Sequence, residues 1–144
     1  MKRLLFLILL VFMAIVLRAQ NDLQVRPLFD GKIIPQERMV VTRIKGGMMQ
    51  KYRLSLFHSV AFDGTEEEAN HVSTLVEKEE HIGSSDYQSK KVKTWKRQLP
   101  AKNGKNRFLC FKSNKKGNVY HVIVVYMEGA LASLKELGMI LIDQ

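Results

Sequence analysis

The stretch VYHVIVVYM, residues 119–127, decides the fold of this 144-residue chain. Apart from His121 it is apolar on both faces of an extended strand, which is typical of a strand covered, or nearly covered, on both sides. We therefore predict that residues 119–127 form a central strand of a sheet. The segments on either side indicate how that sheet is built.

Upstream of this strand, turn residues divide the chain into an antiparallel meander. We predict a strand over 91–99, followed by a tight turn at Asn103-Gly104, where the pair supplies the positive φ that such a turn requires. Residues 107–112 form the returning strand, and a second turn over 114–117 leads into the central strand.

Two further strands are predicted nearer the N-terminus. Residues 39–45 form the first and end at Gly46-Gly47. Residues 52–62 form the second, because apolar and small or polar side chains alternate there at period two. His58 falls on the apolar face of that strand.

Helices are predicted before and after the meander. Thr65 with Glu68 three residues later forms a capping box that begins a helix over 65–80. A second helix is predicted over 130–141, where leucines recur at helical spacing. Together the segments predict an α+β fold, in which an antiparallel meander sheet of four to five strands packs against two helices.

An apolar leader precedes this domain. Residues 4–17 are fourteen consecutive apolar residues that follow Lys2 and Arg3 and end at Arg18. A membrane-spanning helix needs about 20 apolar residues, so this shorter run predicts a signal peptide over 1–19, cleaved near Ala19-Gln20. An uncleaved anchor is the alternative. The signal peptide predicts an exported protein, periplasmic or extracellular.

The remaining chain is predicted to hold one domain. Residues 20–36 contain two prolines and an Asp-Gly pair that interrupt any period, so we expect an extended lead-in there, followed by a single α+β domain over 37–144. The only cysteine, Cys110, cannot form an internal disulfide, and its apolar neighbours predict that it packs as a small apolar residue. An intermolecular disulfide is the alternative.

Three stretches of the chain carry a resemblance to known proteins: FDGTEEEANHVSTLVEKEE (62–80), LPAKNGKNRFLCF (99–111) and VIVVYMEGALASLKEL (122–137). They resemble short exported proteins of Bacteroidetes that belong to families of unknown function. The resemblance implies an exported compartment and a small α+β domain, and it brings no active site.

Charge is unevenly distributed along the chain. The chain carries 23 Lys and Arg against 14 Asp and Glu, a net charge of +9, and residues 90–116 hold eleven bases and no acid. Clustered bases create a positive potential that concentrates anions, and an aromatic ring among them can stack on a sugar or base. The candidate anion-binding residues are Lys90, Lys91, Lys93, Lys96, Arg97, Lys102, Lys105, Arg107 and Trp95. The alternative is a solvated, lysine-rich sheet edge that blocks unwanted strand pairing.

These features favour a non-catalytic, envelope-associated binding or accessory module for an anionic partner: a glycan, lipopolysaccharide or acidic lipid, or an acidic protein face. Export and the absence of recognition motifs argue against nucleic acid. One alternative is a structural homo-oligomer that joins the basic segment to the acidic 65–80 helix. The other is a small hydrolase whose site assembles only in three dimensions, with His58 and His121 as candidates if their strands pair. No metal-ligand spacing, cofactor fingerprint or catalytic motif occurs, so no cofactor, metal site or enzymatic activity is expected.

Overall fold

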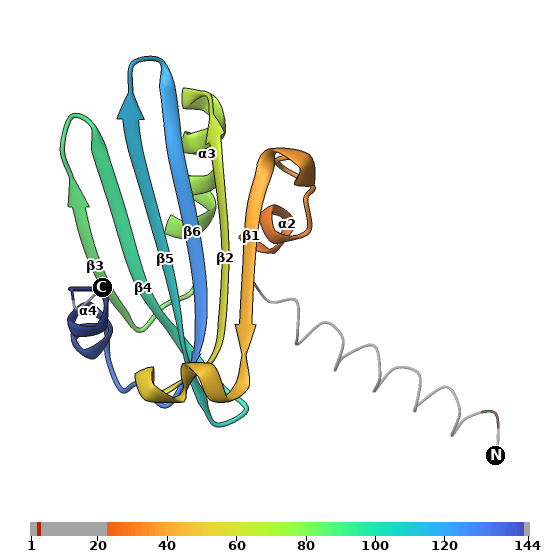
Figure 1. Ribbon diagram of the computed structural model, residues 1–144, viewed down its shortest axis with the longest axis vertical. Coiled ribbons are helices and arrows are strands. Elements are labelled where there is room, and N and C mark those ends of the chain that lie inside the picture. Colours follow the sequence, from red (N-terminus) through yellow and green to blue (C-terminus); the bar gives the residue numbers. More distant parts are fainter. Residues whose placement is uncertain (1–2, 4–22, 143–144) are drawn as a thin grey trace.

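The computed structural model describes Arg3 and residues 23–142. Its strands form one antiparallel sheet in the order β1-β2-β6-β5-β4-β3 (Figure 1). The strands are β1 (Met39–Lys45), β2 (Leu54–Gly64), β3 (Gly83–Gln88), β4 (Val92–Lys102), β5 (Lys105–Lys116) and β6 (Val119–Gly129). The helices are α2 (Arg26–Phe29), α3 (Glu66–Glu77) and α4 (Leu134–Ile142), with 3-10 turns η1 (Gln36–Arg38) and η2 (Gly46–Tyr52).

The predicted α+β class, the meander and the central strand are confirmed. β6 lies between β2 and β5, so the most apolar strand has a neighbour on each side. Its cover is less complete than expected, because Ile123 is 38% exposed on one face. The predicted signal peptide, residues 1–19, lies outside the described residues apart from Arg3.

The strand count of four to five was wrong, because β3 was missed. Its sequence, GSSDYQ, lacks alternating apolar residues, and nearly all of it is exposed. Backbone pairing with β4 in a continuous register holds this strand at the edge of the sheet. An edge strand of this kind leaves no period-two signal for sequence analysis to detect.

The two faces of the sheet carry separate apolar clusters. On one face, Val72 and Val76 of α3 pack on Phe111 and Val124, and all four side chains are fully buried. On the other face, Phe108 packs with Leu131 and Leu137 near α4 and with Met49 of η2. Figure 1 shows α3 lying along the sheet, with η2 and α4 at its lower end. The second cluster therefore covers only the lower part of its face.

The lead-in differs from the extended segment that we expected over 20–36. Within its described part, residues 26–29 form the short helix α2, and Val25, Leu28 and Ile34 are 0% exposed in the cluster shared with α3. The buried Glu79 carboxylate accepts a hydrogen bond from the Val25 backbone at 2.8 Å. The lead-in is part of the core, and it forms one wall of the site described below.

Both predicted helices are present, and each is shorter than expected: α3 spans Glu66–Glu77, and α4 begins later than expected and ends at Ile142. The capping box is formed: the Glu68 backbone donates to the Thr65 hydroxyl at 3.2 Å, and the Glu68 carboxylate accepts from the Thr65 backbone at 3.0 Å. The second helix begins at Leu134 instead of residue 130. Among the described residues, no helix combines the length and the apolar character needed to cross a membrane.

Candidate anion-binding site

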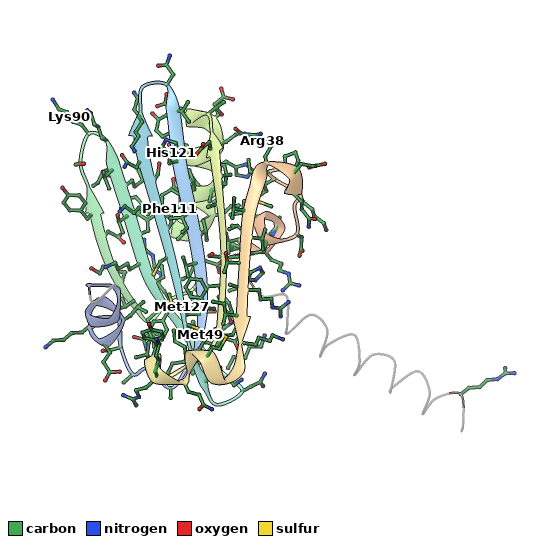
Figure 2. All side chains as sticks on the ribbon, in the orientation of Figure 1. Arg38, Met49, Lys90, Phe111, His121 and Met127 are labelled. Atoms are coloured by element: carbon green, nitrogen blue, oxygen red, sulfur yellow. The ribbon has the colours of Figure 1, made fainter. Side chains whose placement is uncertain are left out.

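The structure divides the predicted basic segment between the two ends of the sheet. Lys90 and Lys91 lie in the β3–β4 turn, and Figure 2 shows Lys90 at the upper tip. Lys102 and Lys105 flank the β4–β5 turn at the other end of β4. A strand of this length spans roughly 33 Å at about 3.3 Å per residue. The candidate residues therefore do not form a single patch.

Two of the candidates are buried between these ends. Trp95 is 8% exposed within the core cluster beneath α3, and Arg97 is 5% exposed. The Arg97 guanidinium forms a bidentate ion pair with Asp86 of β3. A ligand on the surface cannot stack on Trp95 in this arrangement, and Arg97 already has its counter-charge.

The remaining candidates follow the same division. Lys90, Lys91 and Lys93 line a small cavity of about 160 Å³ at the upper end, where Glu66 faces them. Lys96 is half-buried on the opposite face of the sheet. Of the candidate residues, only Lys102, Lys105 and Arg107 line a larger cavity.

This cavity has a volume of about 590 Å³ and lies at the lower end of the face that carries α2 and α3. Segments distant in sequence form its walls: Leu23 and α2, the end of β1, the beginning of β2, the β4–β5 turn and the end of β6. Six Arg and Lys side chains line it, namely Arg26, Arg43, Lys45, Lys102, Lys105 and Arg107. Its volume falls within the range of roughly 300–1,000 Å³ that small-ligand pockets occupy.

Strand register brings these side chains together. Arg43 of β1 lies opposite His58 of β2, which in turn lies opposite Tyr126 of β6. The next row on the same face runs from Lys45 through Leu56 to Glu128, and Arg107 of β5 lies opposite Glu128. Side chains two residues apart along a strand point to the same face, so the two rows form one floor that is polar except at Leu56.

His58 is the histidine in this floor. Its ring lies 4.6 Å from the Phe29 ring, measured between centroids and tilted by 44°. Burial lowers the pKa of His58, and the positive charges of Arg43 and Arg26 lower it further. Both effects favour the neutral form of His58, with burial contributing most and the positive charges of Arg43 and Arg26 adding to it.

Tyr126 and Glu128 form the polar end of the floor. The Tyr126 hydroxyl donates a hydrogen bond of 2.6 Å to the Glu128 carboxylate. Burial raises the pKa of Tyr126, and the bond to Glu128 raises it further, while Arg107 acts in the opposite direction. Arg107 is 5% exposed and donates from Nε to the Pro100 carbonyl at 2.9 Å. These bonds orient three of the side chains that line the cavity.

The charge balance in the cavity is strongly positive. Against the six bases there are two carboxylates, Asp30 and Glu128. Asp30 accepts from Arg26 at 3.2 Å, and Glu128 accepts from Tyr126. Arg43 and Lys45 form no ion pair within residues 23–142. The arrangement is suited to a multiply charged anion, which would neutralise cations that repel one another.

Sequence analysis missed half of the bases in this cavity. Arg43 and Lys45 stand two residues apart in a predicted strand, which places both on one face, and this spacing was a usable signal. No local sequence pattern places Arg43 and Lys45 near Arg107 or Arg26. The pairing register of the strands brings Arg107 to them, and the fold of the lead-in brings Arg26. The run of bases at 90–116 covers both ends of the hairpin, and of the candidate residues in it Lys102, Lys105 and Arg107 line this cavity.

The histidines do not converge. β2 and β6 pair, but His58 lies opposite Tyr126, whereas His121 lies opposite Asp63, five residues further along β2 and on the other face. Among the described residues, no group of three or more His, Cys, Asp or Glu side chains is arranged to hold a metal ion. The constellation of His58 with His121 that we considered for a hydrolase is therefore not formed.

Cys110 lies against the second apolar cluster, beside Phe108 and Val125. It is a free cysteine, and burial of the thiol raises its pKa to about 12, against the opposing charge of Lys96. A thiol in this environment stays protonated at neutral pH and is a poor nucleophile. Its placement supports packing as a small apolar residue.

Comparison with known proteins identifies a family without an assigned activity. The model of a family described as "Family of unknown function (DUF6108)" matches residues 12–141, which is most of the chain. No curated protein matches the chain.

Proposed function

The chain belongs to this family of unknown function, and we propose that it is an exported, non-catalytic binding module of the cell envelope whose basic cavity holds an anionic partner. The observation that supports the proposal is the lining of the cavity, in which six Arg and Lys side chains face two carboxylates that both have partners. Four separate segments contribute these bases, so the cluster is a product of the fold.

The shape of the cavity favours a small, highly charged group as the ligand. Its volume of about 590 Å³ suits a compact head group or one or two sugar units, while an acidic protein face would need a broad, flat surface. Leu23, Phe29 and Leu56 provide apolar walls beside the cations. Phosphate or sulfate esters on a glycan, on lipopolysaccharide or on an acidic lipid combine these properties and occur in the compartment that the leader predicts.

The test is a titration with a sulfated disaccharide derived from heparin, followed by calorimetry at low and high salt. We expect saturable binding that weakens steeply with salt, because the screening length falls from about 10 Å at 0.1 M to about 3 Å at 1 M. Reversing two charges on the cavity floor, Arg43→Glu with Lys45→Glu, should weaken binding by at least about tenfold.

A control variant has the same net charge as the Arg43→Glu, Lys45→Glu variant but carries its two substitutions elsewhere. Lys90→Glu with Lys91→Glu makes the same change at the upper tip of the sheet, and we expect it to leave the affinity almost unchanged. Equal loss in both variants would show non-specific attraction to a basic protein. Loss in the Lys90/Lys91 variant alone would move the site to the hairpin tip and contradict the assignment to the cavity.

A further inference from the structure

The opposite face of the sheet carries a second opening that the basic cavity does not explain. η2 and α4 cover only the lower end of this face. Above them lies an open groove of about 540 Å³ whose floor is formed by Val40, Ala61 and Ile123. These three residues lie in one cross-strand row, because Val40 is opposite Ala61, and Ala61 is opposite Ile123. Val40 is 70% exposed and Ile123 is 38% exposed, so a stripe of apolar surface faces solvent.

A hydrogen-bonded polar network lies at one end of this stripe. The Arg38 guanidinium donates to both oxygens of Glu68, at 2.8 and 2.9 Å, and to the Asp63 carbonyl at 3.0 Å. These bonds tie the end of β2 to the beginning of α3 and fix the backbone that carries the Asp63 side chain. Figure 2 shows Arg38 and His121 at this upper end of the sheet.

Asp63 in turn orients His121. The Asp63 carboxylate contacts Nδ1 of His121, the residue opposite it on β6, and both side chains line the groove. With Nδ1 engaged, Nε2 is the ring nitrogen left for a ligand, and no described residue hydrogen-bonds to it. The Asp63 carboxylate accepts a hydrogen bond from Nδ1, and in the protonated ring Nε2 carries the second hydrogen, which can be donated to an anion.

Lys112 stands on the other side of the same stripe. It lies opposite Ile123 on β5, it is exposed, and it forms no ion pair with a carboxylate of residues 23–142. The charged groups that line the groove are Arg38, Lys112, Asp63 and His121. An anion placed between Lys112 and His121 would meet two donors beside an apolar floor.

We propose that this groove binds a monocarboxylate with an apolar chain, such as a fatty acid. The chain lies on Val40, Ala61 and Ile123, and the carboxylate accepts hydrogen bonds from Lys112 Nζ and His121 Nε2. Burial of the alkyl chain on the exposed stripe drives binding, and the two donors set its direction. The groove and the basic cavity lie on opposite faces of the sheet, so this site is independent of the anionic partner proposed above.

The test is an NMR titration of ¹⁵N-labelled protein with octanoate. The protein used is the chain that accumulates in the cell, with or without its leader as mass spectrometry shows. We expect saturable shifts of the backbone amides of Val40, Ala61, Lys112, His121 and Ile123. The variants Lys112→Glu and Ile123→Glu should each weaken binding by at least about tenfold, the first by repelling the carboxylate and the second by disrupting the apolar floor. 1-Octanol, which has the same chain without the charge, should bind more weakly than octanoate.

The controls separate this site from the surrounding surface. Lys116→Glu makes the same charge change on the same hairpin, outside the groove, and should leave octanoate binding intact. Arg43→Glu with Lys45→Glu should leave it intact as well, while Lys112→Glu should leave binding of the sulfated disaccharide unchanged. The proposal is overturned by an absence of saturable shifts, by shifts confined to other residues, or by equal affinity for octanol and octanoate.

Discussion

The Arg38 side chain connects three elements of this structure, because from η1 it bonds to β2 and to α3. Its guanidinium bonds both oxygens of Glu68, the same carboxylate that completes the capping box with Thr65. The Glu68 side chain therefore caps the N-terminus of α3 and also binds α3 to η1, the turn before β1. Capping residues contribute typically about 1 kcal/mol, and the charge-assisted pair adds to that local stability.

The pKa of Glu68 makes this network testable by its pH dependence. The hydrogen bonds from Arg38, followed by that from the Thr65 backbone, lower the pKa of Glu68 from 4.5 to about 2. A pKa that is lower in the folded state than in the unfolded state gives stability that is present above the unfolded value and lost as the pH falls through the folded one. Wild-type protein should therefore exceed the Glu68→Gln variant in free energy of unfolding at neutral pH.

The difference should stay constant above about pH 4.5 and shrink as the pH falls toward about 2. Urea denaturation at a series of pH values measures it. Glu67→Gln removes a neighbouring, exposed charge from the same helical turn without touching Arg38, and it should show no comparable pH dependence. A pH-independent difference for Glu68→Gln would show that the ionised carboxylate is not what stabilises the turn.

At the scale of elements, the junction after β6 explains why the last helix begins late. Gly129 ends the strand, and a Cβ at this position would lie 2.4 Å from the Arg53 carbonyl oxygen and 2.6 Å from the Leu54 Cα. The next residue, Ala130, donates to the same Arg53 carbonyl at 2.8 Å. The chain is thus held against the beginning of β2 and can turn into a helix only after leaving that contact.

A pair of glycine substitutions tests this account. Gly129→Ala should destabilise the protein by about 1–3 kcal/mol, because the clash is with backbone atoms that cannot move cheaply. Gly138→Ala, inside α4 with open space around it, should stabilise by about 0.5–1 kcal/mol, because alanine loses less conformational entropy in a helix. Thermal or chemical denaturation measures both changes. Similar effects in the two variants would contradict the close contact at Gly129.

At the scale of the whole molecule, the basic side chains are distributed differently in the folded protein than along the sequence. The eleven bases of residues 90–116 are distributed over both ends and both faces of a long hairpin, and Arg97 and Arg107 are buried. Six Arg and Lys side chains instead line one cavity where α2, β1, β5 and the β4–β5 turn meet. A linear run of lysines is thus a poor guide to potential on a sheet, because a strand separates residues by about 3.3 Å per position.

Export is a prediction for the whole polypeptide. If residues 1–19 are a signal peptide, mass spectrometry of the accumulated protein should show a chain that begins at Gln20, and cell fractionation should place it outside the cytoplasm. The measured mass also distinguishes cleavage from retention of the leader. Recovery of the intact chain in the membrane fraction would support the anchor instead and would change the set of partners available to the basic cavity.

The sequence by itself determined the elements that carry local signals. Period-two alternation, the Asn103-Gly104 turn and the Thr65 capping box set the meander and the first helix, because each depends on residues a few positions apart. Edge strand β3 and the folded lead-in were decided by tertiary structure, since their stability comes from pairing and burial against distant segments. The basic cavity belongs to the second group: register alone aligns Lys45 with Glu128 and Arg107, and no local pattern encodes register between strands so far apart in the chain.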